Sequence, residues 1–292
     1  CAGGGGRIDL GIMEMAVRVW ASDCIDPLER QQIEAGTALL LPPELMGSHV
    51  ASTTSHTTGR TLGLTVRAST AMFGHMGVEW NLLEASAEER ADLAAWIALH
   101  KELRHLLHTG RVVHVDHPDA GWSVHGVVSA DKDDAVFSLM RVATSPVRPG
   151  PAIALPGLDA DADYRLEELL PDGVRSPVEY DPRFPESWAW WQEGVTLPGR
   201  ILSGVGLRFP DLMPEHASEF ILRAQQRQQT ARHIDVATGH RKRVRLHLIH
   251  HGESVVELAI RQRRSNTLAH AIHVGGQRGV VDQPHVVRDR LG

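Results

Sequence analysis

The sequence predicts a mixed fold in which alternating strands and helices of the (β/α) barrel type precede an antiparallel β-domain. Three observations lead to this prediction. Short apolar runs alternate with helical patterns up to Gly110. Beyond it, short β-type runs are separated by Pro, Gly and Asp. From residue 224 onward, no aromatic residue occurs at all. We therefore expect three regions, at 1–110, 111–223 and 224–292.

The first region contains apolar runs that read as strands at 16–22, 45–51 and 76–80, and helical patterns at 58–75 and 86–108. Two helix starts carry clear signals. Asp26 can accept hydrogen bonds from the first free amides, Pro27 suits the first position and Glu29 completes a capping box. Ser86 and Glu89 repeat the capping-box spacing. The order strand–helix, three times over, is typical of a (β/α) barrel.

The second region reads as a series of short strands, which predicts an antiparallel sandwich or Greek key. A proline-rich loop at 171–198 interrupts the series and carries Trp188, Trp190 and Trp191. These rings could stack on a sugar or fill the loop against the barrel, and we slightly favour the second. The predicted strands are 111–117, 122–129, 135–143, 152–155, 164–170, 199–207 and 219–222.

Composition and charge narrow the class of protein. The 292 residues carry a formal net charge of −6, which argues against nucleic acid as a partner of the whole chain. No run is long and apolar enough to cross a membrane, and the first residues lack the order of a signal peptide. Two cysteines, Cys1 and Cys24, do not make a disulfide framework. We read both as thiols, which predicts a cytoplasmic location.

A glycine-rich stretch at 1–9 is followed by an acidic residue, Asp23, at the end of the first predicted strand. Glycines let a ring approach the backbone closely, and a carboxyl group at the C-terminal end of a barrel strand is typical of a catalytic residue. This layout is typical of a sugar-cleaving barrel. A nucleotide-binding loop is disfavoured because no Lys-Ser or Lys-Thr follows the glycines. Asp26 already supplies the helix cap, which leaves Asp23 for chemistry.

Four motifs resemble, in the same order, those of bacterial α-galactosidases of glycoside hydrolase family 36. They are the stretches 1–9, 19–30, 34–50 and 73–80. The resemblance covers residues 1–222. It implies the C-terminal part of a (β/α)8 barrel followed by the family's antiparallel β-sandwich domain. The implied reaction is hydrolysis of terminal α-linked galactose, as in melibiose and raffinose-type sugars, with retention and without a cofactor.

The resemblance also implies roles for three residues. Asp23 corresponds to the general acid/base, and Cys1 and Gly3 correspond to residues that line the galactose pocket. The family's nucleophile is an Asp in an upstream Lys-Trp-Asp motif, and this sequence contains no such motif. A retaining glycosidase needs two carboxyl groups about 5 Å apart. We therefore expect the later part of a longer enzyme, inactive alone. Family members are often oligomeric, which makes a homo-oligomer of the full-length enzyme plausible.

Alternatives of other classes stay open. The chain could be an inactive remnant with a carbohydrate-binding or structural β-domain. His114, Asp116 and His117 could suggest a metal site, but on a strand His117 faces away from the other two. We predict no metal.

The region 224–292 differs in kind from the rest. It carries a net charge of +7, against −13 for residues 1–223, and holds 8 of the 18 histidines. Aromatic residues supply much of the buried area of a core, so this tail is poorly equipped to build one. We expect either a disordered basic extension or the translation of a shifted reading frame. His247, His250 and His251 then belong to a solvated basic segment.

Overall fold

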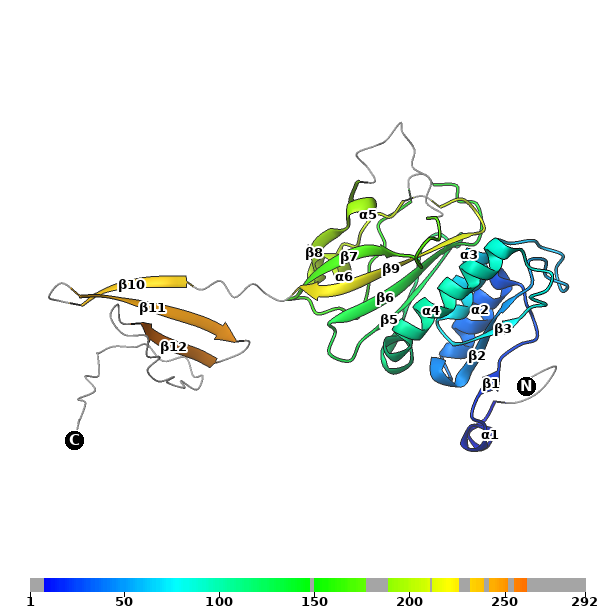
Figure 1. Cartoon of the computed structure of the whole chain (residues 1–292), viewed down its shortest axis with the longest axis horizontal. Coiled ribbons are helices and arrows are strands. Elements are labelled where there is room, and N and C mark those ends of the chain that lie inside the picture. The colour runs from blue at the N-terminus through cyan, green and yellow to red at the C-terminus, as the bar shows by residue number, and fades with distance from the viewer. Residues whose placement is uncertain are drawn as a thin grey trace. The chain divides into compact units, whose positions relative to one another are not determined.

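The computed structural model describes residues 8–147, 150–176, 189–210 and 212–225, and the backbone of three further strands at 232–238, 242–251 and 255–261. The chain divides into two compact units, Cys1–Gln225 and Gln226–Gly292 (Figure 1). Cys1, Gly3 and Trp188 lie outside the described residues. No described helix combines the length and the apolar character that crossing a bilayer requires.

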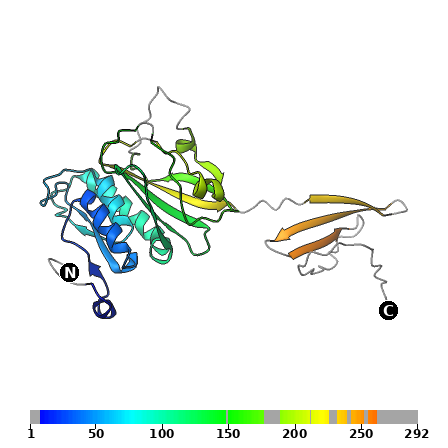
Figure 2. The same ribbon diagram turned by 180° about the vertical axis from the view of Figure 1, so that it is seen from behind.

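The N-terminal part of the first unit is a three-stranded parallel sheet with the strand order β1, β2, β3. The helices α2, α3 and α4 lie between this sheet and a second, larger one (Figure 1, Figure 2). This alternation of strands and helices confirms the predicted β/α portion. The elements are α1 (Leu10–Met15), β1 (Val19–Trp20), α2 (Pro27–Ala38), η2 (Pro43–Leu45), β2 (Met46–Ala51), α3 (Leu64–Met72), β3 (His75–Glu79) and α4 (Ala87–Thr109).

Side-chain caps start the two long helices where the sequence predicts them. Asp26 accepts hydrogen bonds from the amides of Leu28 at 2.9 Å and Glu29 at 3.5 Å. Ser86 forms a reciprocal capping box with Glu89, in which both bonds measure 3.0 Å. Each cap satisfies amides that have no partner inside the helix.

The Ser86 cap gives a measurable contribution to stability. Replacing Ser86 by alanine is expected to lower the free energy of unfolding by about 1 kcal/mol, because an amide at the start of α4 loses its acceptor. Urea unfolding followed by circular dichroism measures the change. Ser86→Thr keeps the hydroxyl and is expected to behave like the wild type. If the alanine and threonine variants unfold at the same urea concentration, the cap does not carry this stability.

The C-terminal part of the first unit is a six-stranded antiparallel sheet with the order β4-β5-β6-β9-β7-β8. It confirms the predicted antiparallel β-domain, although the described residues form one sheet here rather than two facing sheets. The α3–α4 layer covers one face, and α5, α6 and adjoining loops cover the other. The elements are β4 (Arg111–Val115), β5 (Trp122–Val128), β6 (Asp134–Arg141), β7 (Asp163–Leu169), α5 (Ala189–Glu193), β8 (Val195–Pro198), α6 (Gly199–Gly204) and β9 (His216–Gln225).

One apolar core joins the two parts of this unit. Val50 of β2 and Trp96 of α4 belong to the same buried cluster as Val127, Val136 and Ile221 from the antiparallel sheet. Strand alternation explains the arrangement, because Phe220 faces the opposite core while its neighbour Ile221 faces the helices. The helices are thus buried on two sides.

Several predicted elements differ from the structure. The predicted strand 199–207 is instead the helix α6, and Leu202 on it is fully buried. The strand predicted at 152–155 reduces to a single bridge between Ile153 and Leu207. The helix predicted at 58–75 is shorter in the structure, where only α3 is helical. The strand predicted at 16–22 is likewise reduced to β1.

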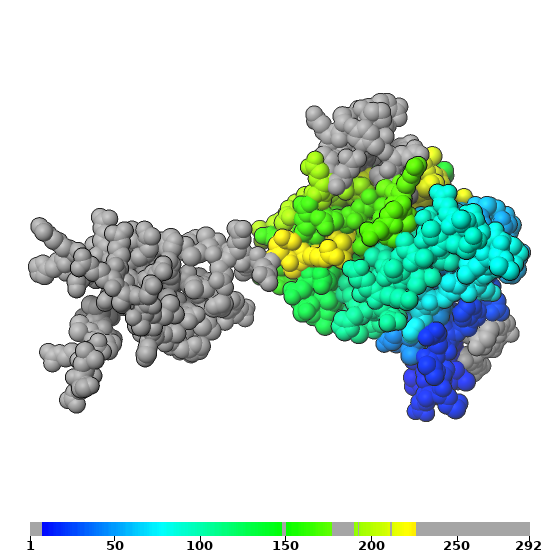
Figure 3. Space-filling model, viewed as in Figure 1, coloured from blue at the N-terminus to red at the C-terminus, as the bar shows by residue number. Residues whose placement is uncertain are grey.

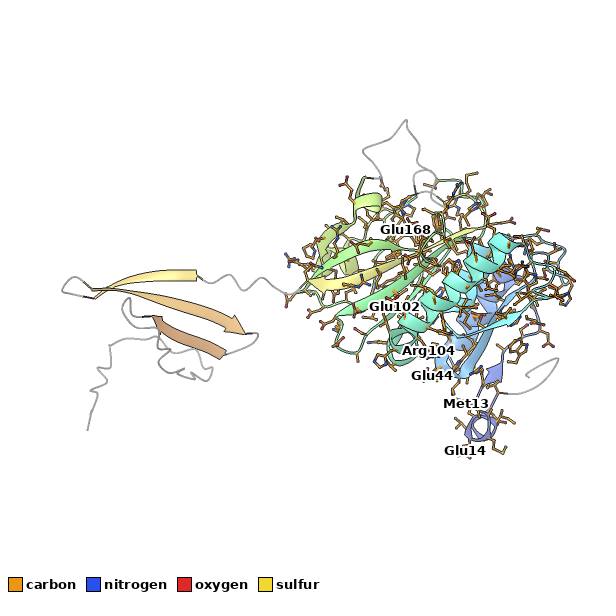
Figure 4. The ribbon with its side chains drawn as sticks, viewed as in Figure 1. Met13, Glu14, Glu44, Glu102, Arg104 and Glu168 are labelled. Atoms are coloured by element: carbon orange, nitrogen blue, oxygen red, sulfur yellow. The ribbon has the colours of Figure 1, made fainter. Side chains whose placement is uncertain are left out.

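The helix α1 stands away from the body of the unit (Figure 3, Figure 4). Met13 and Glu14 lie on it. Leu10 and Met15 are both 79% exposed, which is unusual for large apolar side chains. The sequence analysis predicts no helix here. The exposed apolar residues of α1 pack against no residue that the structure describes.

The second unit contains a three-stranded antiparallel sheet of β10 (Arg232–Thr238), β11 (Lys242–His251) and β12 (Val255–Arg261). The two alternatives for residues 224–292, a disordered basic extension or a shifted reading frame, stay predictions. The side chains of His247, His250 and His251 lie outside the description.

Candidate active site

The carboxyl ends of the three parallel strands meet at one edge of the small sheet, and Asp23 lies there. It follows β1 by three residues and is exposed. In a barrel, this edge carries the groups that act on substrate. Asp23 thus lies at the carboxyl edge of the parallel sheet, and its catalytic role stays a prediction.

A buried histidine, His49 of β2, lies on the interior side of the same sheet. Its neighbour Ser48 points the other way and donates a hydrogen bond to Glu34 of α2, so strand alternation turns His49 away from the helices. The His49 ring stacks on Trp20, with the ring centres 4.4 Å apart and the planes at 6°. Gly47 makes room for this pair, since a Cβ atom there would lie 3.1 Å from the Trp20 ring.

The charge state of His49 follows from its surroundings. Only 4% of the residue is exposed. Burial and, to a smaller extent, the nearby Arg30 guanidinium lower the pKa of His49, the charge of Asp23 opposes them, and the net pKa is about 4. His49 is therefore neutral at neutral pH and lies within electrostatic reach of Asp23. Its Nε2 atom is 2.7 Å from Glu79 Oε2, a close polar contact that lacks hydrogen-bond alignment.

The turn that carries Asp23 is fixed from the helix side. The amide of Cys24 donates to Ser22 Oγ at 3.1 Å. Arg30 of α2 donates from Nη1 to the carbonyl oxygens of both Ser22 and Cys24. These contacts hold the backbone on either side of Asp23.

The Arg30 charge is balanced by Glu34, one helical turn along α2. Arg30 Nε donates to Glu34 Oε1 at 2.8 Å, and Ser48 Oγ donates to the same oxygen at 2.5 Å. Burial raises the pKa of Glu34, and the attraction of Arg30 and the Ser48 hydroxyl oppose that rise. The pair lies in the helix–sheet interface, where removing one partner would leave a buried group without its bond.

Asp26 has a structural role that separates it from Asp23. It is fully buried, caps α2 and forms an ion pair with Arg60. Thr58 Oγ1 also donates to it, at 2.5 Å. One oxygen of this carboxylate thus caps α2 while the other holds the loop after β2, which gives Asp26 a structural role.

Other residues that the sequence singles out lie elsewhere. Trp191 is 4% exposed in the β-domain core, where its ring contacts Phe209 and Phe220, and Trp190 packs beside it. These rings fill the β-domain core rather than the junction with the barrel. The ring of Trp80 packs against the Arg67 guanidinium, whose Cζ atom lies 4.6 Å from the ring centre.

The histidine-rich stretch at the start of the β-domain shows no metal geometry. His114 pairs with His125 across β4 and β5, and His117 Nδ1 faces the carbonyl oxygen of Asp119. Across the described ranges, no group of three or more His, Cys, Asp or Glu side chains is arranged to hold a metal ion.

Sequence reasoning missed the support of the site. Arg30 and Glu34 are spaced i and i+4 on a predicted helix, which signals an ion pair but ordinarily one at the surface. His49 lies near the end of the strand predicted at 45–51, a position at which packing is the more common role. Nothing in the spacing predicts its stacking on Trp20.

Comparisons with known proteins agree with this geometry. Residues 1–110 match the family model described as Melibiase, and residues 122–222 match the Glycosyl hydrolase family 36 C-terminal domain. The chain is 36% identical over 217 residues to an α-galactosidase of Escherichia coli, covering 74% of this chain and 31% of that protein. It is 33% identical over 200 residues to the α-galactosidase AgaA of Geobacillus stearothermophilus, covering 64% of this chain and 27% of that protein.

Solved structures show the same likeness. A variant of AgaA crystallised with raffinose superposes with a TM-score of 0.64 at 26% identity, over 76% of this chain and 28% of that one. The galactosidase domain of the α-galactosidase–sucrose kinase AgaSK gives a TM-score of 0.64 at 27% identity, over the same shares. This sequence thus spans about a third or less of the length of the curated relatives that it matches. The chain therefore carries two regions of glycoside hydrolase family 36, a melibiase region at 1–110 and the family's C-terminal domain at 122–222.

Proposed function

We propose that this polypeptide supplies the general acid/base, Asp23, to an active site that hydrolyses terminal α-D-galactosyl residues with retention. The observation that carries the proposal is the place of Asp23 at the carboxyl edge of the parallel sheet. The chain that contains this sheet is similar to α-galactosidases. Crystal structures of AgaA variants with raffinose and stachyose support raffinose-type oligosaccharides, and melibiose, as the substrate class. Cys1 and Gly3 are proposed to line the galactose pocket.

The chemistry divides between two carboxyl groups. Asp23 donates a proton to the glycosidic oxygen while a carboxylate attacks the anomeric carbon, and the Asp23 carboxylate then takes a proton from the water that releases galactose. The attacking carboxylate is proposed to lie upstream, outside this sequence, which contains no Lys-Trp-Asp motif. We therefore propose that the 292 residues alone do not turn over substrate.

Hydrolysis of melibiose and of 4-nitrophenyl α-galactoside tests this function. The assay compares these 292 residues with a longer polypeptide that adds the upstream coding sequence. We expect activity in the longer polypeptide only. Activity in the shorter one would contradict the division of labour and would point to a carboxylate of this sequence, such as Glu79, as the nucleophile.

A second candidate function is an inactive remnant that binds carbohydrate or serves a structural role. It is favoured by one observation, that these 292 residues contain no Lys-Trp-Asp motif to supply the nucleophile. If the gene encodes no Lys-Trp-Asp motif upstream and both polypeptides are inactive, the remnant replaces the enzyme as the better account. The cytoplasmic location and the homo-oligomeric full-length enzyme stay predictions.

A further inference from the structure

A single buried guanidinium, that of Arg30, reaches the backbone on both sides of Asp23. Its Nη1 atom lies 3.1 Å from the carbonyl oxygen of Ser22 and 3.0 Å from that of Cys24. Asp23 lies between these two residues. The turn follows β1 and lies beyond the hydrogen-bond ladder of the sheet, so the helix side provides its anchor.

The remaining nitrogens of the guanidinium bind the neighbouring elements. Nη2 donates to the carbonyl oxygen of Gly47 on β2 at 3.4 Å, and Nε donates to Glu34 Oε1 at 2.8 Å. Ser48 holds the same Glu34 oxygen from β2. Arg30 is 1% exposed. The Arg30 guanidinium therefore links the turn, the helix α2 and the strand β2 through hydrogen bonds.

This contact needs an arginine rather than a positive charge alone. A guanidinium presents five donors in a rigid plane, whereas a lysine ammonium is a compact group with three donors on a flexible stem. A lysine at this position cannot bond the two carbonyl oxygens, Gly47 and Glu34 with the same geometry. The two residues should therefore differ in how well they fix the turn, at equal charge.

We propose that Arg30 is a positioning residue for hydrolysis, which orients the Asp23 carboxyl group toward the leaving-group oxygen by fixing the backbone at Ser22 and Cys24. The inference rests on the proposed function of Asp23. Arg30 makes no contact with substrate in this role. Since proton transfer requires the acid within hydrogen-bond distance of the leaving oxygen, a small displacement of the turn costs rate rather than binding.

The kinetic test compares Arg30→Lys with Arg18→Lys in the longer polypeptide. Arg18 is exposed, so this control makes the same chemical change outside the contact network. For Arg30→Lys we expect kcat on melibiose to fall by about 10²-fold with KM nearly unchanged. The fall in kcat/KM on 4-nitrophenyl α-galactoside should be much smaller than that on melibiose, because kcat/KM reports the first step and this leaving group needs little protonation. An equal fall on both substrates, or none, would overturn the proposal.

Alkylation of Cys24 gives a second readout that needs no catalysis. Cys24 is partly buried in the same turn, with its Sγ atom 3.8 Å from Thr57 Oγ1. In the 292-residue chain, we expect Arg30→Lys to raise the Cys24 alkylation rate several-fold and Arg18→Lys to leave it unchanged. Peptide mapping by mass spectrometry separates Cys24 from Cys1. An unchanged rate in a folded Arg30→Lys protein rules out the anchoring role.

The two readouts separate failure of this inference from failure of the proposed function. If the longer wild-type polypeptide is inactive, the proposed function falls, while the Cys24 rate still decides whether Arg30 fixes the turn. If Arg30→Lys does not fold, Ser48→Ala is the second variant, because it removes only the hydroxyl that holds Glu34. It should shift both readouts in the same direction, and wild-type values for both would overturn the proposal.

Discussion

Replacing Asp23 by asparagine in the longer polypeptide is expected to lower kcat/KM for melibiose by about 10²- to 10⁴-fold, the range that general acid–base catalysis supplies. The amide keeps the size of the side chain but cannot deliver a proton to the glycosidic oxygen or accept one from water. The loss on 4-nitrophenyl α-galactoside should be smaller, since 4-nitrophenolate leaves without protonation. Steady-state kinetics on the two substrates measures the difference.

The matched control is Glu29→Gln, which makes the corresponding change at an exposed carboxylate in the first turn of α2. It should retain wild-type kinetics on both substrates. If Asp23→Asn keeps most of the activity on melibiose, Asp23 is not the acid/base. The carboxyl group in that role would then have to come from another strand end.

A loss of stability with rising pH is the second large expected effect, and Glu219 of β9 is its source. This carboxyl group is fully buried on the face of the sheet that meets α3. Burial, with a smaller contribution from the charge of Glu168 on β7, raises its pKa from 4.5 to about 8. Glu168 is labelled in Figure 4. The hydroxyls of Ser69 and Ser138 oppose it, with Ser138 Oγ 3.2 Å from Glu219 Oε1.

The sign of the effect follows from these values. The pKa of Glu219 in the folded protein, about 8, lies above the ordinary value of 4.5, so its contribution to stability is complete below pH 4.5 and is lost as the pH rises through 8. At about 1.4 kcal/mol per pKa unit, the loss amounts to several kcal/mol. Urea unfolding at pH values from 4.5 to above 8 should show the decrease. Glu219→Gln, which is neutral at every pH, should remove most of it.

Glu167→Gln is the control, because Glu167 lies on the adjacent strand β7 with its side chain 43% exposed and paired with Arg165. It should leave the pH dependence of unfolding unchanged. If wild type and Glu219→Gln lose stability in parallel above neutral pH, the carboxyl group is not the source of the effect.

Local signals explain which elements the sequence predicts correctly. The start of α4 depends on Ser86 and Glu89, and the start of α2 depends on Asp26 and Pro27, all of which act within one helical turn. The strands β2 and β3 were predicted because apolar residues cluster in short runs. Such features depend on neighbours in sequence, so they can be recognised without knowing the fold.

The wrong element predictions arise where contacts between residues distant in sequence determine the local structure. Gly199–Leu207 is apolar enough for a strand, yet the first six residues form α6. There Gly199 packs so closely on the Asp159 carbonyl oxygen that a Cβ atom would clash with it. Ile153 was predicted within a strand, but its described strand pairing is a single isolated bridge to Leu207. Neither partner is visible from local spacing.

The site shows the same division. Asp23 was predicted from its place after an apolar run and from the family resemblance. The residues around it were not, because Arg30 reaches Ser22 and Cys24 across a helix–strand junction. Burial also decides the charge of His49, and burial depends on which face of β2 points into the barrel.

The core shared by α4, β2 and the antiparallel sheet limits how this region can be divided. Trp96 and Ile221 belong to one cluster although they come from opposite sides of the boundary between the two family models. Separating the chain at Gly110 would expose both halves of that cluster to water. We therefore expect the two family domains to be inherited together, because recombination between them breaks packing on each side. An exchange of this region with a relative should transfer both domains at once.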